Sequence, residues 1–388
     1  MHDARQEDPA GRPCVLRRNR NRGIGRVILE KLTIENYRNI ASAVFEPGRE
    51  LTVICGKNGQ GKTNLLEAVW MLTGGRSFRG AKDAELIREG AEYAVAEGVA
   101  EGGGRENEIR IFVGGNPGAR KTRTARVNGV AHGLAGNAAG TFTAVVFDPG
   151  HLSLVKGGPE GRRRFLDTAL CQLYPGYVTL LRRYTRLVTQ KNALLKQYFQ
   201  TPDADGLLDV FDEKLAESGA EVSRRRREYL SLIGPEATST YREIAGGGET
   251  LTLQYEASCE DAADLARILH ESRRRDTAAG FCTAGPHRED LSIVVDGREA
   301  KRFASQGQQR SAVLSLKLAE AAGARQITGE HPVMLLDDVL SELDETRQAY
   351  LLCRMSHRQT IVTACDANLF GRTGGKICRM ENGVLSNS

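Results

Sequence analysis

Residues 56–63 read Gly56-Lys57-Asn58-Gly59-Gln60-Gly61-Lys62-Thr63 and fill every specified position of the phosphate-loop pattern G-x-x-x-x-G-K-S/T. The apolar run Leu51–Cys55 before them is typical of a short buried strand, and Asn64–Leu72 after them has a helical pattern. Glycines let backbone N–H groups curl around phosphate oxygens, and the helix N-terminus adds partial positive charge. The stretch therefore predicts a nucleotide site in which Lys62 binds the β- and γ-phosphates and Thr63 binds Mg²⁺.

Length and composition set the broad class of the protein. The 388 residues leave room for about two or three domains. The sequence has neither the apolar run of a membrane-spanning helix nor the apolar N-terminal stretch of a secretory signal. Its eight cysteines are scattered, with no C-x-x-C motif. We therefore expect reduced thiols and a cytoplasmic protein.

The charge of the chain is concentrated at its N-terminus. The net charge is +5, and residues 1–26 carry seven arginines against three acids, which is +4 and leaves +1 for the remainder. We expect residues 1–26 to be a disordered basic extension, either a solvated tail or a contact for nucleic acid. Bulk charge gives no argument for nucleic-acid binding elsewhere, so a DNA-binding face must come from local patches.

Residues 27–158 have the pattern of a β-rich first half of a head domain. The later part of Val27–Tyr37 alternates apolar and polar residues, as a half-buried strand does. A glycine- and arginine-rich loop, Gly74–Gly80, follows the helix predicted after the phosphate loop. Asn128-Gly129 is typical of a hairpin turn. We expect an antiparallel sheet beside the phosphate-loop sheet, with further strands at Tyr93–Val99, Glu108–Val113, Arg123–Val127 and Thr141–Phe147.

Residues 159–285 change to helical patterns and are expected to form an inserted lobe. Apolar residues recur at three- and four-residue steps in Tyr177–Gln200 and Leu207–Ile233, with Thr201–Gly206 as the turn of a helical hairpin. The pattern breaks at Gly219 and Arg226. We therefore expect a short arm in which neither helix exceeds about 30 residues.

Arginine runs are a second feature of this lobe. A single run is usually a solvated helix face, whereas several in one segment favour contact with nucleic-acid phosphates. The runs are Arg162–Arg164, Arg182–Arg183, Arg186, Arg224–Arg227 and Arg273–Arg275.

Residues 286–388 return to a β-rich pattern and form the second half of the head. Leu291–Val295 and Glu299–Phe303 are expected strands around the turn Asp296-Gly297. Ser305–Arg310 then opens a helix that runs to about Ala324. Its start is either an ordinary N-cap or a second anion-binding helix end.

Two carboxylates end the next predicted strand. Val333–Leu336 is apolar, as a central parallel strand is, and Asp337 and Asp338 follow at its carboxyl end, where such sheets bind ligands. Asp337 is placed to hold Mg²⁺ through water, and Asp338 to orient or deprotonate the attacking water. Arg358–Ala364 is a further buried strand, and Ile377–Met380 with Asn382-Gly383 begins a final hairpin.

In their order, four motifs resemble the ATP-binding-cassette head of the SMC and Rad50 class: Gly56–Thr63, Ser305–Arg310, Val333–Asp338 and Ser341–Asp344. Five further stretches resemble the bacterial RecF family of recombination and repair ATPases: Asn36–Asn39, Ser77–Arg79, Leu154–Gly157, Arg163–Asp167 and Gly285–Leu291. The resemblance spans Val27 to about Gly383. It implies an α/β fold of the ATP-binding-cassette type: a mixed parallel sheet, an antiparallel β-subdomain and an inserted α-helical lobe.

The same resemblance implies an ATP-dependent homodimer. In that dimer Ser305, Gly307 and Gln308 of one subunit would cap the γ-phosphate held by the phosphate loop of the other. Arg38 is implied as a further nucleotide contact. Lys62, Ser305 and Asp338 would be the catalytic residues.

Family membership would also imply a biological role. The expected function is slow, DNA-stimulated ATP hydrolysis that resets a dimer bound to single-stranded or gapped DNA. RecO and RecR would be partners, and the outcome would be help with RecA loading during DNA replication, recombination, repair and the SOS response to DNA damage.

Two departures from the cassette pattern and three functional hypotheses remain. Asp338 stands where many cassette ATPases have glutamate, which fits slow hydrolysis, and Cys365-Asp366 stands where many have histidine. No residue matches the usual glutamine-loop contact. The hypotheses are a DNA-repair ATPase switch, a transporter energy subunit, and an SMC- or Rad50-like scaffold that binds ATP and DNA without useful turnover.

Overall fold

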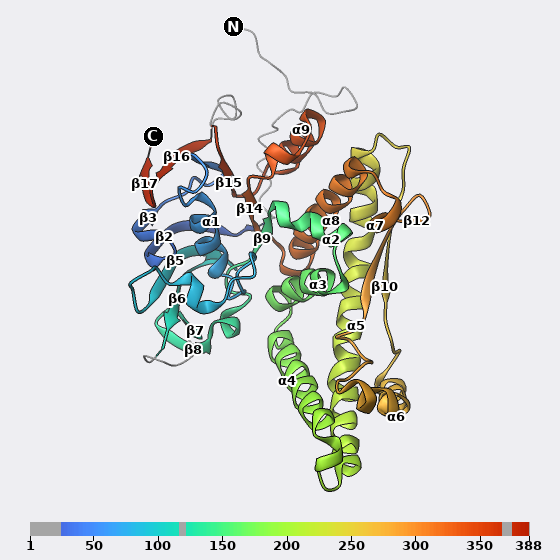
Figure 1. The fold of residues 1–388 in the computed structure, drawn as a ribbon. Helices are drawn as coiled ribbons and strands as arrows, with labels where there is room; N and C mark the ends of the chain where they lie inside the picture. Colours follow the sequence, from blue (N-terminus) through green and yellow to red (C-terminus); the bar gives the residue numbers. More distant parts are fainter. Residues whose placement is uncertain (1–24, 116–121, 367–374, 388) are drawn as a thin grey trace.

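The computed structural model describes residues 25–115, 122–366 and 375–387 (Figure 1). A six-stranded sheet at the centre of the head has the order β17-β16-β4-β15-β14-β9. Its strands are parallel except for the β16–β17 hairpin. The bounds are β4 (Leu51–Cys55), β9 (Ala144–Phe147), β14 (Val333–Asp337), β15 (Thr360–Ala364), β16 (Lys376–Glu381) and β17 (Val384–Asn387).

A second, antiparallel sheet has the order β3-β2-β5-β6-β7-β8. It confirms the expected antiparallel subdomain, with Asn128-Gly129 as the turn between β7 and β8. The strand expected at Thr141–Phe147 is an exception, because its residues Ala144–Phe147 form β9 of the parallel sheet. The bounds are β2 (Ile28–Tyr37), β3 (Ile40–Phe45), β5 (Ala94–Gly102), β6 (Arg105–Gly114), β7 (Thr122–Val127) and β8 (Val130–Leu134).

Helix α1 (Lys62–Met71) lies between the two sheets. One apolar cluster joins Leu65 and Val69 of α1 to Ile34 of the antiparallel sheet and to Leu335 of the parallel sheet. The opposite face of the parallel sheet, which includes Leu336, packs on helices α3 (Pro159–Leu173) and α8 (Gln306–Thr328). Because both faces of β14 are covered, its sequence is continuously apolar and does not alternate.

The inserted arm consists of α4 (Tyr177–Lys196), α5 (Ala204–Ile244) and α6 (Ala262–Ala279). The helical hairpin is confirmed, but the expected limit on helix length is wrong, since α5 is continuous over 41 residues. Gly219 has no side chain, which allows Leu265 to pack closely against the helix: an added Cβ would lie 2.7 Å from Leu265 Cδ2. Arg226 is buried on the same helix in an ion pair with Asp167. Both apparent breaks are therefore packing sites within one helix.

Two further expectations need correction. Glu299–Phe303 is not a strand, because β12 covers only Arg298–Glu299 and Ala300–Phe303 forms α7. Gly25–Arg26 forms β1, which pairs in parallel with β13 (Glu330–His331), so the end of the expected disordered extension is ordered. The rest of that extension, residues 1–24, lies outside the described residues.

The inserted segment also contributes a strand, β10 (Leu251–Glu256), which pairs with β11 (Asp290–Val295). Among the residues that the structure describes, no helix combines the length and apolar composition needed to cross a bilayer. The remaining short helices are η1 (Asp83–Leu86), η2 (Ala135–Ala138), η3 (Pro149–Leu152), α2 (Ser153–Lys156), η4 (Tyr198–Gln200), η5 (Leu340–Glu342) and α9 (Glu345–Arg354).

Candidate functional site

The predicted phosphate loop connects the carboxyl end of β4 to the first turn of α1. Gly59 and Gly61 have φ angles of 80° and 110°, a region that side chains disfavour. At Gly56 an added Cβ would lie 2.3 Å from the Met380 carbonyl oxygen, so only glycine fits. Lys62 Nζ donates to the carbonyl oxygens of Gly56 at 2.6 Å and Lys57 at 3.1 Å. The lysine ammonium thus lies in the cradle that its own loop forms.

Residues that sequence reasoning missed brace this loop from the side. The Gln60 side-chain oxygen accepts from the Asn382 amide at 2.6 Å, and the Gln60 carbonyl accepts from Gly383 N at 2.9 Å. Asn39 Nδ2 also donates to the Gln60 carbonyl, at 3.2 Å. The β16–β17 and β2–β3 turns therefore hold the loop in place. The only sequence signal for this role was the presence of asparagine at both turns.

The predicted magnesium ligands meet at the carboxyl edge of the parallel sheet. Thr63 Oγ1 donates to Asp337 Oδ1 at 2.8 Å, and Thr363 Oγ1 donates to the same oxygen at 2.8 Å. Burial raises the pKa of Asp337, while the hydrogen bonds from the two hydroxyls oppose that rise. A hydroxyl and a carboxylate are oxygen ligands of the kind that Mg²⁺ prefers, and the ion takes its other ligands from phosphates and water. The residues present therefore fit a magnesium ion.

Asp338 follows at the end of β14 in an unusual backbone conformation. Its φ angle is 51°, which aspartate tolerates better than most residues. Its amide donates to Thr363 Oγ1 at 2.9 Å. In the described part of the chain its carboxylate has no hydrogen-bond or ion-pair partner, which leaves it available to a water or a ligand.

Asp148 is a second carboxylate that sequence reasoning missed. The register pairs Phe147 of β9 with Leu336 of β14, so the next residues, Asp148 and Asp337, are neighbours. His151 Nδ1 lies 2.8 Å from Asp148 Oδ2. Burial alone would raise the pKa of Asp148, but the hydrogen bond and charge of His151 lower it. No local motif marked Asp148, because its position depends on a strand pairing far apart in sequence.

Arg38, the further nucleotide contact implied by resemblance, lies beside α1 at the β2–β3 turn. Its Nε and Nη2 donate to the two carboxylate oxygens of Glu67 at 3.0 and 3.2 Å. Ser77 Oγ donates to the same carboxylate. Arg38 is thus tied to the helix that follows the phosphate loop and not to the loop itself.

Ser305, Gly307 and Gln308 form the N-terminus of α8. Ser305 Oγ accepts from Gln308 N at 3.2 Å, and the Gln308 side chain accepts from Ser305 N at 2.7 Å, which is a complete capping box. Gln308 Nε2 also donates to Glu249 Oε1 at 3.0 Å. Within the described residues no hydrogen bond joins this helix end to the phosphate loop of the same chain. The ordinary N-cap is present, and a role in anion binding stays a prediction.

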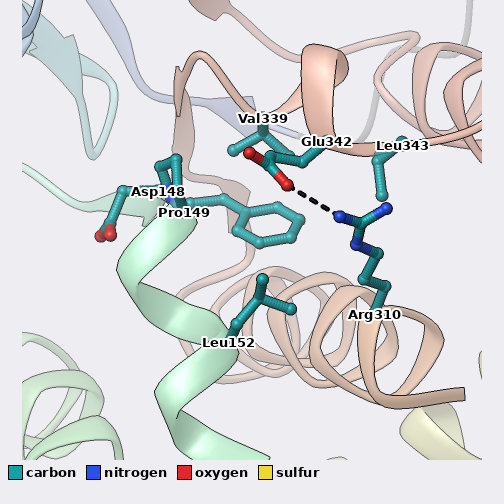
Figure 2. Close-up of a pocket in the computed structure, with 8 residues that line it drawn as sticks. Asp148, Pro149, Leu152, Arg310, Val339, Glu342 and Leu343 are labelled. Carbon is teal, nitrogen blue, oxygen red and sulfur yellow. Dashed lines mark hydrogen bonds and ion pairs between the residues drawn. The ribbon is translucent and has the colours of Figure 1, made fainter. Parts of the chain in front are cut away.

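Figure 2 shows how α8 is joined to the segment after Asp338. Arg310 Nη2 of α8 pairs with Glu342 Oε2 of η5 at 2.9 Å, while the Asp148 carboxylate points away from the small cavity between these elements. The cavity has a volume of about 10 Å³, room for roughly one water. It is far too small for a nucleotide, so it serves as a packing junction.

Two of the arginine runs that suggested phosphate contact hold the fold together. Arg162 is buried and makes a bidentate pair with Asp290 at 2.6–2.7 Å. Arg226 is buried and makes a bidentate pair with Asp167 at 2.8 Å. Arg224 is exposed but lies between Glu221 and Glu228. These arginines already have acidic partners, so the runs as wholes are not a DNA surface.

Comparison with known proteins agrees with this geometry. Residues 28–383 match the family described as the RecF/RecN/SMC N terminal domain. The DNA replication and repair protein RecF of Symbiobacterium thermophilum is 40% identical over 358 residues, 87% of this chain and 91% of that protein. RecF of Ruminiclostridium cellulolyticum is 35% identical over 355 residues, 89% of this chain and 94% of that protein.

Solved structures give the same answer. A structure of the recombination mediator protein RecF with ATP in the RecFOR pathway is 31% identical, has a TM-score of 0.87 and covers 95% of this chain and 100% of its own. An Smc head domain from Pyrococcus furiosus, with 16% identity, a TM-score of 0.53 and coverage of 93% and 96%, shares the fold. On the family match, the identities and the coverage, the chain belongs to the RecF family of DNA replication and repair proteins, within the wider group of RecF, RecN and SMC N-terminal domains.

Proposed function

We propose that this protein is an ATP-driven switch that binds DNA during recombinational repair and replication. The observation that carries the proposal is the meeting of Thr63, Asp337 and Thr363 beside the phosphate loop, with both hydroxyls 2.8 Å from one carboxylate oxygen. That arrangement suits a nucleotide triphosphate with Mg²⁺ and has no evident purpose in a protein that binds neither. ATP-bound RecF, at 31% identity over nearly the whole chain, supports ATP as the nucleotide.

In the proposed site each residue has one task. The backbone of Gly56–Thr63 and the Lys62 ammonium bind the phosphates. Thr63 and Asp337 hold Mg²⁺, which supplies charge neutralisation on the phosphate oxygens. Asp338, whose carboxylate is unengaged, orients the attacking water or accepts its proton. Thr363 positions both aspartates, since it donates to Asp337 Oδ1 and accepts from Asp338 N at 2.9 Å.

The proposed active form is an ATP-dependent homodimer. Ser305, Gly307 and Gln308 do not contact the phosphate loop of their own chain, yet the helix N-terminus that they form suits a phosphate. A second copy of the chain would bring this end to the γ-phosphate held by the first. Arg38 would then act indirectly, through Glu67 and α1.

The proposed partners are single-stranded and gapped DNA, together with RecO and RecR. The protein would act in the cytoplasm and help to load RecA. The recombination and repair role of the relatives supports this assignment. A transporter energy subunit is disfavoured by the inserted arm. A DNA-binding scaffold without turnover is the alternative that only a rate measurement can exclude.

The test combines binding and hydrolysis on purified protein. Gapped DNA on beads should retain the wild-type chain with ATP and Mg²⁺, and retention should fall when Lys62→Ala replaces it, because removal of the phosphate-binding cation costs tight ATP binding. Phosphate release should be slow and should rise with DNA. Retention of Lys62→Ala together with wild-type hydrolysis would refute the nucleotide site, and normal ATP-dependent retention without any phosphate release would favour the scaffold.

A further inference from the structure

Among the described residues, several exposed arginines that have no acidic partner, or only an exposed one, gather where the head meets the arm. Four of them are Arg76 in the loop after α1, Arg164 on α3, and Arg182 and Arg186 on α4. We call these four residues the basic seam. Within the described residues only Arg164 pairs with an acid, Glu160, at 3.3 Å and with both side chains more than half exposed. Such an exposed pair is weak, so a phosphate can compete with Glu160 for Arg164, and the other three arginines have no acidic partner in the described part of the chain.

The head side of the seam is a loop whose backbone is fixed. Trp70 Nε1 donates to the Arg76 carbonyl at 2.7 Å, and the Arg123 guanidinium donates to the Gly75 carbonyl. These hydrogen bonds fix the backbone of the loop, and the Arg76 side chain is exposed to solvent. At the other end of the loop, a Cβ added to Gly80 would lie 3.9 Å from Arg164 Nη1, so loop and α3 are in contact there.

The arm side of the seam is the first half of α4, which lies against η2 of the head. Arg182 Nη1 donates to Asn137 Oδ1 at 3.3 Å. A Cβ added to Gly136 would lie 3.5 Å from Arg182 Nη2. Arg186 follows one helical turn further along the same face of α4, about 6 Å away. The seam therefore includes residues of both the head and the arm, at the end of α4 that lies against the head (Figure 1).

An electrostatic effect on a neighbouring thiol supports the closeness of the two sides. Burial raises the pKa of Cys171 to about 12, and the charges of Arg182 and Arg76 both oppose that rise. The two arginines come from different lobes, yet both act on one side chain.

We propose that the basic seam binds the phosphate backbone of DNA across the junction of head and arm. This inference rests on the proposed function as a DNA-binding protein and names the surface that carries it. Guanidinium groups match phosphate oxygens and read no base sequence, so the contact suits a protein that acts wherever damage occurs. It also separates the arginines available to DNA from Arg162 and Arg226, which are buried in ion pairs, and from Arg224, which contacts two glutamates.

The experiment measures the salt dependence of DNA affinity. A labelled gapped duplex is titrated with protein and ATP from about 50 to 200 mM salt, and binding is followed by fluorescence anisotropy. The variant Arg182→Gln with Arg186→Gln should bind more weakly, and the slope of log affinity against log salt should flatten by about two units, roughly 0.9 for each lost duplex phosphate contact. Arg76→Gln, on the head side, should flatten it by about one unit.

Two controls separate charge from structure. Arg224→Gln with Arg225→Gln removes the same number of charges from α5, but these arginines pair with Glu221, so the slope should stay near wild type. Asn137→Ala removes the hydrogen bond to Arg182 without changing charge and should also leave the slope unaltered. ATP binding and hydrolysis without DNA should match wild type in all variants, which shows that the nucleotide site is intact.

The outcomes distinguish the seam from the proposed function. A wild-type chain that binds no DNA in the presence of ATP overturns both. Normal wild-type binding, with unchanged affinity and slope in the Arg182 and Arg186 double variant, overturns the seam alone. A loss of equal size in the Arg224 and Arg225 control would show a general effect of net charge and would likewise refute a specific surface.

Discussion

At the scale of single residues, the two adjacent aspartates of the site have different surroundings. Asp337 is buried and accepts two hydroxyl hydrogen bonds at 2.8 Å, whereas Asp338 turns through a positive φ angle and leaves its carboxylate unengaged in the described part of the chain. Backbone strain of this kind is retained where it directs a functional group. Identical side chains can therefore have different roles, one with the metal and one with water.

This difference predicts two distinct phenotypes. Asp338→Asn should keep ATP binding and lose hydrolysis by a factor of about 10²–10⁴, because an amide cannot accept the proton of the attacking water. Asp337→Asn should weaken binding and turnover together, because an amide is a poorer magnesium ligand. Nucleotide binding and phosphate release, each titrated with Mg²⁺, separate the two. Unimpaired turnover in both variants would remove this strand end from the active site.

Cys365 supplies a second prediction at this scale. Its thiol is exposed and lies 3.0 Å from Asn58 Oδ1 and 3.9 Å from Lys62 Nζ. A maleimide adduct there would occupy space beside the phosphate-binding lysine. N-ethylmaleimide should therefore block ATP binding, and bound ATP should protect the protein. Cys365→Ser should bind ATP and resist the reagent. Equal inactivation of Cys365→Ser would place the sensitive thiol elsewhere.

Single residues also show what sequence reasoning could reach. The roles of Lys62 and Thr63 were predictable because the phosphate-loop pattern is local and each position in it has its own requirement. The partner of Arg226 was not predictable, because Asp167 lies 59 residues away and only the folded lobe brings them together. A run of arginines in a sequence shows where positive charge is concentrated. Only the structure shows which of those arginines form ion pairs with acidic side chains and which do not.

At the scale of elements, the long helix α5 shows a similar limit. A glycine and an arginine within an apolar pattern predicted breaks, since glycine weakens helices and arginine is usually exposed. Both residues are explained by contacts with neighbouring elements. Leu265 and Tyr184 approach the helix closely at Gly219, and Arg226 forms an ion pair with Asp167. The parallel strands were easier to predict, since burial on both faces makes them continuously apolar.

Two glycines of α5 allow a matched test of this explanation. At Gly219 a new Cβ would lie 2.7 Å from Leu265 Cδ2 and 3.1 Å from Tyr184 Cε2, while at Gly234 it would meet nothing within 4 Å. Helix propensity favours Gly234→Ala by about 0.5–1 kcal/mol, but Pro235 follows and its ring disfavours a helical residue with a Cβ before it, so the net change in stability should be small. Gly219→Ala should destabilise the protein, since overpacking costs about 1–3 kcal/mol. Urea unfolding followed by circular dichroism measures both. An equally small effect of the two substitutions would show that Gly219 is not a packing site.

At the scale of the whole molecule, the proposed site is divided between two regions of one chain that share no hydrogen bond within the described residues. The phosphate loop lies at the carboxyl edge of the parallel sheet, and Ser305 begins a helix that packs on the opposite face from α1. Polar contacts join that helix to the segment that follows the strand with the aspartates. Arg310 pairs with Glu342 at 2.9 Å, and Arg347 donates to Ser311 Oγ at 2.9 Å and to the Gly307 carbonyl at 3.3 Å. Closure by a partner would therefore act on α8 and on the aspartate segment together.

Ser305→Arg tests this arrangement. If each chain worked alone, an exposed N-cap substitution would cost about 0.5–2 kcal/mol of stability and little activity. In a head-to-head dimer the same side chain enters the closed interface around the γ-phosphate. ATP should still bind each monomer, because Gly56–Thr63 is intact, but dimerisation and hydrolysis should both fail. Light scattering with ATP and a phosphate-release assay measure the two.

A mixing experiment with Lys62→Ala gives the stricter form of that prediction. Each variant alone has no complete site. A mixed dimer has at most one, formed by Ser305 of the Lys62→Ala chain and the intact loop of the Ser305→Arg chain. Any recovery of hydrolysis on mixing should therefore be partial and should require both proteins, while Ser305→Ala, which loses the cap without adding bulk, should still dimerise. Normal ATP-dependent dimers and normal turnover in Ser305→Arg would contradict the shared site and leave each nucleotide bound by one chain alone.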